Sequence, residues 1–299
     1  MGEARAAAST NGIFGFKPSY GIVSRFGLIG LVPSMECFGI LAGAVEDIAV
    51  VMGVIAGPDD RDLSMPECKI PDFSQVSAGK KAHVTAGFVR EFVETLDPSA
   101  VRSFRMMLSE LERKGLKIQE VSIPDFELFQ AVHNVIGSVE ASSSAGKYDG
   151  VRYGHRTDSA KNWNEMYLKS CAESFGLLVK SYLFQGAYFQ FENYTAFENA
   201  CRIRRCLLRE TEDLFSVADV LVFSTVHPGL DPARAYTISH VYDAFSMTLP
   251  ASVTGHPAVA LPASEDVPGL QLVGPYLSDT WLLSLASRLA SSMESGGGA

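Results

Sequence analysis

The sequence predicts an α/β protein built on a sheet with crossover helices. Residues 82–89 and 117–123 have strand-like apolar patterns, and an amphipathic helical pattern lies between them. Strand–helix–strand alternation of this kind is typical of such sheets. Three further short apolar runs, at 219–224, 258–261 and 270–273, are bounded by turn residues. These runs are expected to add buried strands.

Helical patterns account for much of the remaining chain. Residues 44–56 place apolar side chains at three- and four-residue spacing and end at a Gly-Pro pair. Asp97 and Pro98 supply a capping carboxylate and an N1 proline for the crossover helix. The middle of the chain, 126–215, is helical and aromatic in pattern. It includes a long arginine-bearing helix expected over 192–214.

The two ends of the chain have different compositions. Residues 12–39 are rich in Gly, Ser and aromatic residues, which predicts close-packed loops and short strands. A last amphipathic helix is expected at 279–291, and the Gly-rich stretch 292–299 predicts a flexible tail. Because neither a repeat nor a linker is visible, residues 12–291 are expected to belong to one domain.

Composition excludes several classes of protein. A chain of 299 residues with 47% hydrophobic and 20% charged residues is typical of a globular protein. A net charge of -9 argues against direct nucleic-acid binding, since phosphates require a basic surface. The five cysteines form no C-x-x-C pair, which favours reduced thiols in an intracellular compartment. No metal-ligand spacing is visible and the apolar runs are too short to cross a bilayer, so we predict no metal, no cofactor and no membrane span.

Several motifs in one order carry a family resemblance. They are GFKPSYG at 15–21, VSRFG at 23–27, YDGVRYGHR at 148–156, ACRIRR at 200–205, YDAF at 242–245, GHPAVALP at 255–262 and GLQLVG at 269–274. Together they resemble the amidase signature family. The block at 148–156 is similar to one branch, the A subunit of glutamyl-tRNA(Gln) amidotransferase, and the string at 18–25 is most similar to its mitochondrial type.

The resemblance implies a fold and an incomplete chain. Family members have a single α/β/α domain with a mixed sheet, and this sequence resembles only the later part of a complete member. We therefore expect an N-terminally truncated amidase-like domain over 12–291, preceded by an altered remainder of the nucleophile motif at 1–11. Loss of the early part is expected to expose sheet edges and apolar surface, and so to lower solubility.

The resemblance also implies that the catalytic residues are absent. Family enzymes use a serine nucleophile, a second serine in a cis peptide and a lysine, with an oxyanion hole from a glycine-rich turn. Aligned back from Gly12 without gaps, the family's G-G-S-[IT]-R falls on residues 1–5. Gly2 and Arg5 fit this pattern, but Glu3 stands at the position of the nucleophile. The chain is therefore expected to hydrolyse nothing by itself.

Two lysines attract attention as replacement bases. Lys17 lies within the first family motif and Lys147 directly precedes the block at 148–156. Packing or surface roles are the better expectation for both. Serines outside the nucleophile motif lack a G-x-S-x-G context or a paired base.

The positions that would hold substrate are retained. Glutamine carries an α-carboxylate, which suits an arginine fork, and an α-ammonium, which suits a carboxylate. The resemblance implies that Arg204 binds the carboxylate and Asp243 the ammonium, with Tyr148 or Tyr153 lining the pocket. Other interpretations stay open. Arg204 could lie on a solvated arginine face, Asp243 could cap a helix, and the tyrosines could be core aromatics.

The functional hypotheses follow from the family. In the first, the chain is part of a subunit whose family hydrolyses glutamine to supply ammonia for converting Glu-tRNA(Gln) to Gln-tRNA(Gln). Its partners are then the C subunit together with the tRNA-binding B subunit. Its location is mitochondrial or otherwise cytoplasmic, and it binds glutamine if the pocket is completed. In the second, it is an inactive scaffold of a larger assembly. In the third, it derives from an amidase acting on other amides.

Overall fold

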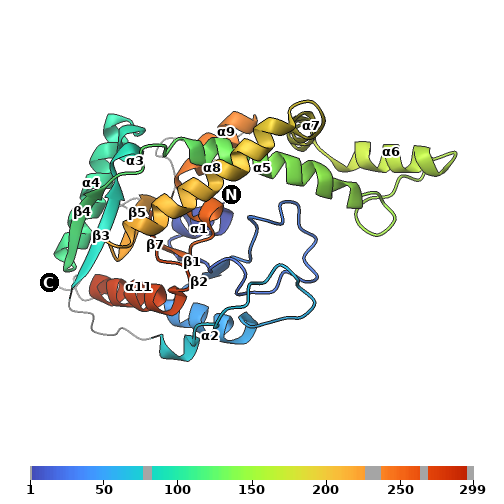
Figure 1. The fold of residues 1–299 in the computed structure, drawn as a ribbon. Coiled ribbons are helices and arrows are strands. Elements are labelled where there is room, and N and C mark those ends of the chain that lie inside the picture. The colour runs from blue at the N-terminus through green and yellow to red at the C-terminus, as the bar shows by residue number, and fades with distance from the viewer. Residues whose placement is uncertain (1, 77–82, 226–236, 263–268, 295–299) are drawn as a thin grey trace.

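A mixed β-sheet forms the centre of the molecule. The computed structural model describes residues 2–76, 83–225, 237–262 and 269–294. In these residues the sheet has seven strands in the order β2-β1-β6-β7-β5-β3-β4 (Figure 1). The strands are β1 (Phe14–Lys17), β2 (Ile40–Ala42), β3 (Val84–Val89), β4 (Leu116–Val121), β5 (Val220–Ser224), β6 (Ala258–Leu261) and β7 (Leu270–Val273).

Burial of the central strands on both faces of the sheet explains why their apolar runs are continuous. β3 pairs in parallel with both β4 and β5, and the other neighbouring pairs are antiparallel. Every residue of β5, β6 and β7 is buried, so both faces of the sheet are covered there. Strands buried on both faces need no polar alternation. The expected mixed sheet is therefore confirmed.

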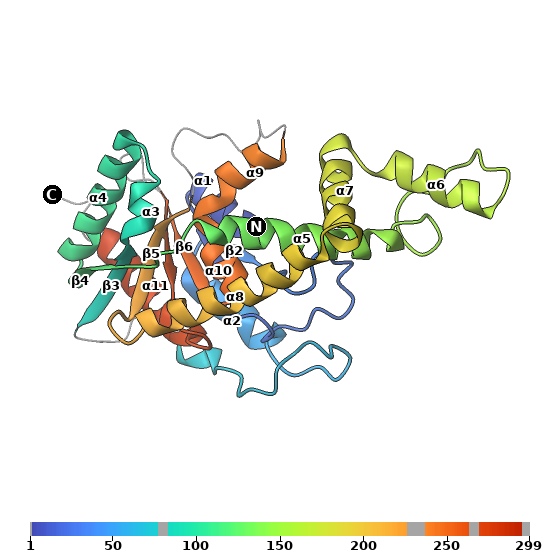
Figure 2. The same cartoon turned by 45° about the horizontal axis from the view of Figure 1, so that its top comes forward.

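Helices cover the sheet on both faces. The described α-helices are α1 (Glu3–Thr10), α2 (Val45–Ile55), α3 (Arg90–Glu94), α4 (Pro98–Arg113), α5 (Leu128–Ser144), α6 (Trp163–Ser174), α7 (Leu177–Phe191), α8 (Tyr194–Leu214), α9 (Ile238–Phe245), α10 (Leu249–Thr254) and α11 (Asp279–Glu294). α2 and α11 lie on one side of the sheet, while α5, α8 and α10 lie on the other (Figures 1 and 2). The α/β/α layering expected from the family resemblance is thus present. No described helix has the length and apolarity that a membrane crossing requires.

Most elements expected from the sequence are present, with differences at both ends. α1 occupies residues for which no helix was predicted. α11 continues to Glu294, so the tail predicted from 292 was wrong in its first three residues, and 295–299 lie outside the described part. The predicted strand start at residue 82 also lies outside it. The helical middle divides into the four helices α5, α6, α7 and α8. The end of α5, α6 and α7 project from the rest of the molecule as an arm, and α6 lies at its tip (Figure 1).

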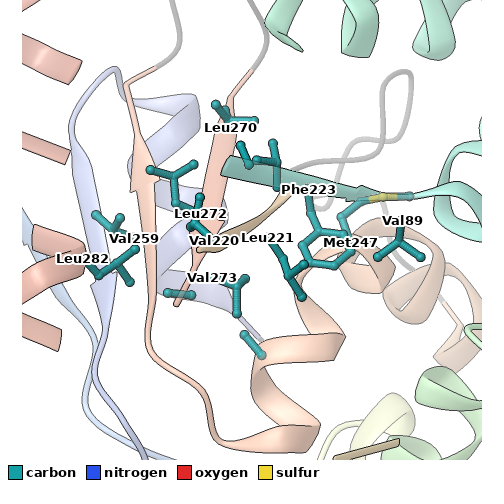
Figure 3. Packing of buried hydrophobic residues seen from close by; sticks show 14 of the residues in the cluster. Val89, Val220, Leu221, Phe223, Met247, Val259, Leu270, Leu272, Val273 and Leu282 are labelled. Carbon is teal, nitrogen blue, oxygen red and sulfur yellow. The ribbon is translucent and has the colours of Figure 1, made fainter. Parts of the chain in front are cut away.

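Apolar side chains from strands and helices fill the space beside the sheet. Figure 3 shows Phe223 of β5 and Met247 close together, and both are almost fully buried. Phe92 packs edge-on against Phe104 of α4 at 5.2 Å between ring centroids and against Phe223 at 5.4 Å. Such edge-to-face pairs add about 0.5–1.5 kcal/mol beyond area burial. This aromatic cluster fixes α3 and α4 against the strands.

Local sequence signals set the helix ends. Asp97 accepts hydrogen bonds from the backbone amides of Ser99 (2.7 Å) and Ala100 (2.9 Å), and so caps α4 as predicted. Gly255 ends α10 with φ 81°, a conformation that favours glycine. A Cβ at this position would also lie 3.1 Å from the Cβ of Tyr20. Gly255 therefore allows the turn into β6 to pass close to the loop after β1.

The arm depends on a close approach of α5 and α7. A Cβ added at Gly186 of α7 would lie only 1.8 Å from the carbonyl oxygen of Ser138 in α5. Gly186 is the only buried residue among the described residues of α7. Its missing side chain lets the two helix backbones touch.

Gly186→Ala is expected to lower the free energy of unfolding by about 2–4 kcal/mol, because the methyl group forces α5 and α7 apart. Urea denaturation followed by circular dichroism measures the loss. Gly53→Ala in α2 is the matched control, since nothing lies within 4 Å of a Cβ there. That helical substitution is expected to stabilise by about 0.5–1 kcal/mol. Equal effects of the two substitutions would contradict the packing explanation.

Candidate functional site

A pocket lies beside α1, at the segment that the sequence aligns with the family's nucleophile motif. Its volume is about 130 Å³. The lining residues are Gly2, Glu3, Ala4, Arg5, Lys17, Met35, Glu36, Cys37, Gly39 and Ser252. We call it the α1 pocket. α1 packs on β1 and β6, where its Ala8 side chain and main chain lie so close to Gly15 that a Cβ there would clash.

Arg5 is the most deeply buried charged group of the α1 pocket. Its side chain is 1% exposed. Nη1 donates to Gln271 Oε1 at 2.5 Å, and Nη2 donates to the Thr248 carbonyl (3.0 Å) and to Ser252 Oγ (2.9 Å). Burial lowers the pKa of Arg5 to about 10, so the guanidinium remains charged at neutral pH. All three acceptors are neutral oxygen atoms, and they join α1 to α10 and β7.

Lys17 and Ser252 are held by the protein itself. Lys17 is buried, and its Nζ donates to the Pro18 carbonyl at 2.9 Å. Burial lowers the pKa of this lysine. Ser252 Oγ accepts from Arg5 and donates to the Thr248 carbonyl at 3.2 Å. Its proton therefore points to a carbonyl oxygen rather than to a base, which is the geometry of a structural hydroxyl. Lys17 has the packing role that the sequence favoured.

Arg204 fastens three segments together. Its Nε donates to the Val253 carbonyl (2.8 Å), Nη1 to Ser34 Oγ (2.9 Å) and Nη2 to the Ser34 carbonyl (2.8 Å). The neighbouring arginines at 202, 205 and 209 are exposed, whereas Arg204 is half-buried. Burial lowers its pKa. The solvated-face interpretation therefore fits the neighbours but is wrong for Arg204.

Asp243 lies inside a helix and faces a different cavity. The N-cap of α9 is Thr237, whose side chain accepts from the His240 amide, so the prediction that Asp243 caps a helix was wrong. Asp243 lines a cavity of about 300 Å³ with Thr95, Phe126, Glu127, Phe129, Gln130, Ser246, Met247 and Leu249. Arg204 is not one of the described residues that line this cavity. Within the described residues, Arg204 and Asp243, the two predicted substrate ligands, therefore do not line this cavity together.

The two predicted tyrosines lie on the arm. Tyr148 Oη donates to the Ile29 carbonyl at 2.7 Å, and its ring packs edge-on against Phe175. The Tyr153 carbonyl accepts from the Gly150 amide at 3.1 Å, and the Arg152 guanidinium lies 5.8 Å from the ring centroid. Both are half-buried. Their contacts tie the arm's loop to itself and to the segment after β1.

A buried cluster of ring side chains was not found from the sequence. His133 Nδ1 lies 2.9 Å from Tyr242 Oη, and Tyr182 Oη lies 3.2 Å from the same oxygen. Burial raises the pKa of Tyr182 to about 12 and also raises that of Tyr242. The three residues come from α5, α7 and α9. Tyr242 opens the YDAF motif, but nothing in the sequence pairs it with residues about 60 and 110 positions away.

Comparison with known proteins decides the family. The amidase sequence profile matches residues 2–283, which is most of the chain. The chain belongs to the amidase family. The predicted resemblance to this family is confirmed, and the profile includes the α1 segment that carries Glu3 and Arg5.

Several relatives of this amidase-family chain share one name. The chain is 32% identical over 294 residues to the A subunit of glutamyl-tRNA(Gln) amidotransferase from Saccharolobus solfataricus, covering 96% of this chain and 61% of the relative. It is 34% identical over 295 residues to the corresponding protein of Synechococcus sp., covering 95% and 60%. The predicted similarity to this type of protein is thereby confirmed. The chain spans about three fifths of the length of these relatives.

Solved structures agree with the fold. The A subunit of glutamyl-tRNA(Gln) amidotransferase from Thermotoga maritima has a TM-score of 0.73 and 25% sequence identity, over 96% of this chain and 60% of that one. The 6-aminohexanoate cyclic dimer hydrolase has a TM-score of 0.74 at 19% identity, which shows a shared fold alone. The amidase fold is therefore present in the described elements.

Arg204→Lys is expected to lower the free energy of unfolding by about 1.5–3 kcal/mol, because one ammonium cannot serve three acceptors in the guanidinium geometry. Arg205→Lys, one residue along α8 and exposed, is the matched control and is expected to stay within about 0.5 kcal/mol. Urea titration of both variants gives the comparison. A neutral result at position 204 would show that its hydrogen bonds are dispensable.

Stability is expected to fall below pH 6.5. Burial lowers the pKa of His133 and of His256 from 6.5 to about 3 in the folded chain. Between these values the unfolded chain binds protons that the folded chain does not, so acid favours unfolding. Each histidine contributes up to about 1.4 kcal/mol per pH unit.

Unfolding free energies measured from pH 6.5 to 5.0 test this expectation, because most carboxylates titrate at lower pH. His133→Gln is expected to remove about half of the slope that the two histidines give. His240→Gln, at an exposed position of α9, controls for the substitution itself. A slope that His133→Gln leaves unchanged would contradict the burial argument.

Proposed function

We propose that this chain is the C-terminal part of an A-type subunit of glutamyl-tRNA(Gln) amidotransferase, and that by itself it does not hydrolyse glutamine. In this proposal the complete family protein releases ammonia from glutamine, which then converts Glu-tRNA(Gln) to Gln-tRNA(Gln). Support comes from relatives of that name, which are 32–34% identical over 93% or more of this chain. The observation that carries the inactivity is the residue in the nucleophile position.

Glu3 replaces the serine that the family resemblance implies. It opens α1 at the mouth of the α1 pocket, and its carboxylate accepts a hydrogen bond from the Gly2 amide at 2.9 Å. A carboxylate is a weak nucleophile toward a carboxamide. Ser252, which lines the same pocket, is held by Arg5 and a carbonyl oxygen. These groups give the pocket no activated hydroxyl.

The geometry of the substrate positions agrees with an incomplete glutamine site. Arg204 uses its three nitrogens on Val253 and Ser34, and Asp243 faces the cavity of about 300 Å³. Binding of an α-carboxylate by Arg204 would require displacing the hydrogen bonds to Ser34. We therefore propose that glutamine binding needs a completed pocket, in which the arginine fork turns from Ser34 toward the ligand.

Ammonia release tests the inactivity. The purified chain with millimolar glutamine is expected to release no more ammonia than glutamine in buffer. Glu3→Ser is the matched variant. It is expected to stay inactive, because a restored hydroxyl still lacks the lysine, the second serine and the oxyanion donors. Ammonia release by the unaltered chain that Glu3→Gln abolishes would overturn the proposal.

Capture of partners tests the role in the amidotransferase. We propose its B and C subunits as partners and, from the mitochondrial-type string at 18–25, a mitochondrial location. A tagged chain isolated from its own cells is expected to carry both, identified by mass spectrometry. Exposed apolar side chains of α2 favour a covered surface, since Val54 is 81% and Val50 is 68% exposed. Isolation of the chain with neither partner would contradict this role.

A scaffold without enzymatic activity is the second candidate, and the same exposed α2 face favours it. Here the chain would be retained for its surface within a larger assembly. Capture of a different and stoichiometric set of proteins, together with no glutamine binding in the assembled state, would support the scaffold. Capture of the B and C subunits with glutamine-dependent ammonia release by the assembly would exclude it.

A further inference from the structure

The α1 pocket contains a thiol to which the family resemblance gives no role. Cys37 is half-buried and lines the pocket with Arg5 and Lys17. These two basic side chains are only 1% and 6% exposed. Arg5 Nε is buried without a hydrogen-bond partner. An unpartnered donor this deeply buried destabilises the fold, which points to a use for the positive charge.

The positive charge of the α1 pocket is opposed only in part, since the charge of Glu3 acts on Arg5 and that of buried Asp279 acts on Lys17. Arg5 and Lys17 direct their hydrogen bonds to neutral oxygen atoms. Glu36 accepts from two backbone amides and lies 3.7 Å from Arg25, so its charge is balanced on the other side. Glu3 lies exposed at the mouth. The interior of the pocket therefore favours an anion.

The electrostatics of the two cations agree with this arrangement. Burial lowers the pKa of Arg5 and of Lys17. Charges interact more strongly in a buried pocket than in water. A thiolate rather than a thiol is the reactive nucleophile, and nearby cations favour it.

The other thiols of known environment differ from Cys37. Cys201 and Cys206 are exposed on α8, where the arginines at 202, 205 and 209 lie at the surface and half-buried Arg204 donates to Val253 and Ser34. Burial raises the pKa of Cys201 and of Cys171. Surface charges are screened by salt far more than buried ones. These thiols provide internal references within the same molecule.

We propose that Cys37 is a nucleophilic thiol in an anion-attracting pocket, and that the α1 pocket takes small electrophiles that carry a carboxylate. The carboxylate is attracted by Lys17 and Arg5 while the electrophilic carbon meets Sγ. A volume of about 130 Å³ admits only a small molecule. This goes beyond the proposed role in the amidotransferase and does not depend on it.

Iodoacetate and its neutral analogue iodoacetamide are the probes. In the reaction the thiol first gives its proton to water. Sγ then forms a bond to the CH₂ carbon, the carbon–iodine bond breaks, and iodide leaves. The product is a carboxymethyl thioether with iodoacetate and a carbamidomethyl thioether with iodoacetamide. Because the electrophilic carbon is flanked by a carboxylate in one reagent and by an amide in the other, the ratio of rates reports attraction of the carboxylate.

The experiment follows each cysteine of the 299-residue chain by peptide mass spectrometry in 1 M NaCl. The Debye length is about 3 Å there, so surface arginines no longer attract the reagent. Cys37 is expected to show an iodoacetate-to-iodoacetamide rate ratio about tenfold above those of Cys201 and Cys206. Equal ratios at the three cysteines would overturn the proposal.

Two variants separate the pocket charges. Lys17→Met is expected to lower the ratio at Cys37 about tenfold, whereas Lys161→Met, at an exposed position before α6, is expected to leave it unchanged. Glu3→Gln removes the carboxylate at the mouth, and in 10 mM NaCl, where the charge of an exposed group is not screened, it is expected to raise the ratio about threefold. Because Glu3 is exposed, this variant keeps the test decisive if Lys17→Met does not fold. No change in the ratio with Glu3→Gln would overturn the proposal.

Discussion

The buried pair formed by Arg5 and Gln271 is the constraint on which the centre of the fold depends. Gln271 lies in β7, fully buried, and accepts from Arg5 while its own amide nitrogen donates to the carbonyls of Ser224 (2.9 Å) and Met247 (2.7 Å). One connected set of hydrogen bonds thus joins α1, β5, β7 and the turn before α10. Polar groups buried this deeply must be satisfied together, because losing one partner leaves the others unpaired.

This network places the α1 pocket. Arg5 donates a hydrogen bond to Ser252, which lines the α1 pocket, and α1 carries Glu3, which also lines it. Arg204 bonds to Ser34 and Val253, which are the chain neighbours of the lining residues Met35 and Ser252. Buried Arg5 and half-buried Arg204 both donate to neutral oxygen atoms. Their role is to hold loops that have little regular hydrogen bonding of their own.

The sequence predicted the strands and long helices well because their signals are local. Asp97 before a proline and the apolar runs of β5, β6 and β7 each define an element within a few residues. The helical nature of α1 was not predicted, since its amphipathic signal is short and the segment was interpreted through its alignment to a turn motif.

Long-range pairings could not be predicted in the same way. The contact of His133 with Tyr242 joins residues 109 positions apart, and the contact of Arg5 with Gln271 joins residues 266 apart. Such pairs depend on how the whole sheet is assembled. The family resemblance predicted Arg204 and Asp243 as ligands of one substrate, and these roles stay predictions; their different environments follow from packing that no local pattern encodes.

Helix geometry explains why the side chain at position 3 of α1 can vary without loss of the fold. Successive residues of an α-helix turn by about 100°, so side chains two positions apart point in nearly opposite directions. Arg5 therefore faces the core, and Glu3 faces the pocket mouth and solvent. A substitution at position 3 leaves the network of Arg5 and Gln271 intact. A substitution at position 5 would leave three buried acceptors without their hydrogen-bond donor. The proposed nucleophile position and the structural anchor Arg5 therefore lie on different sides of one short helix, so that a change in the first leaves the second in place.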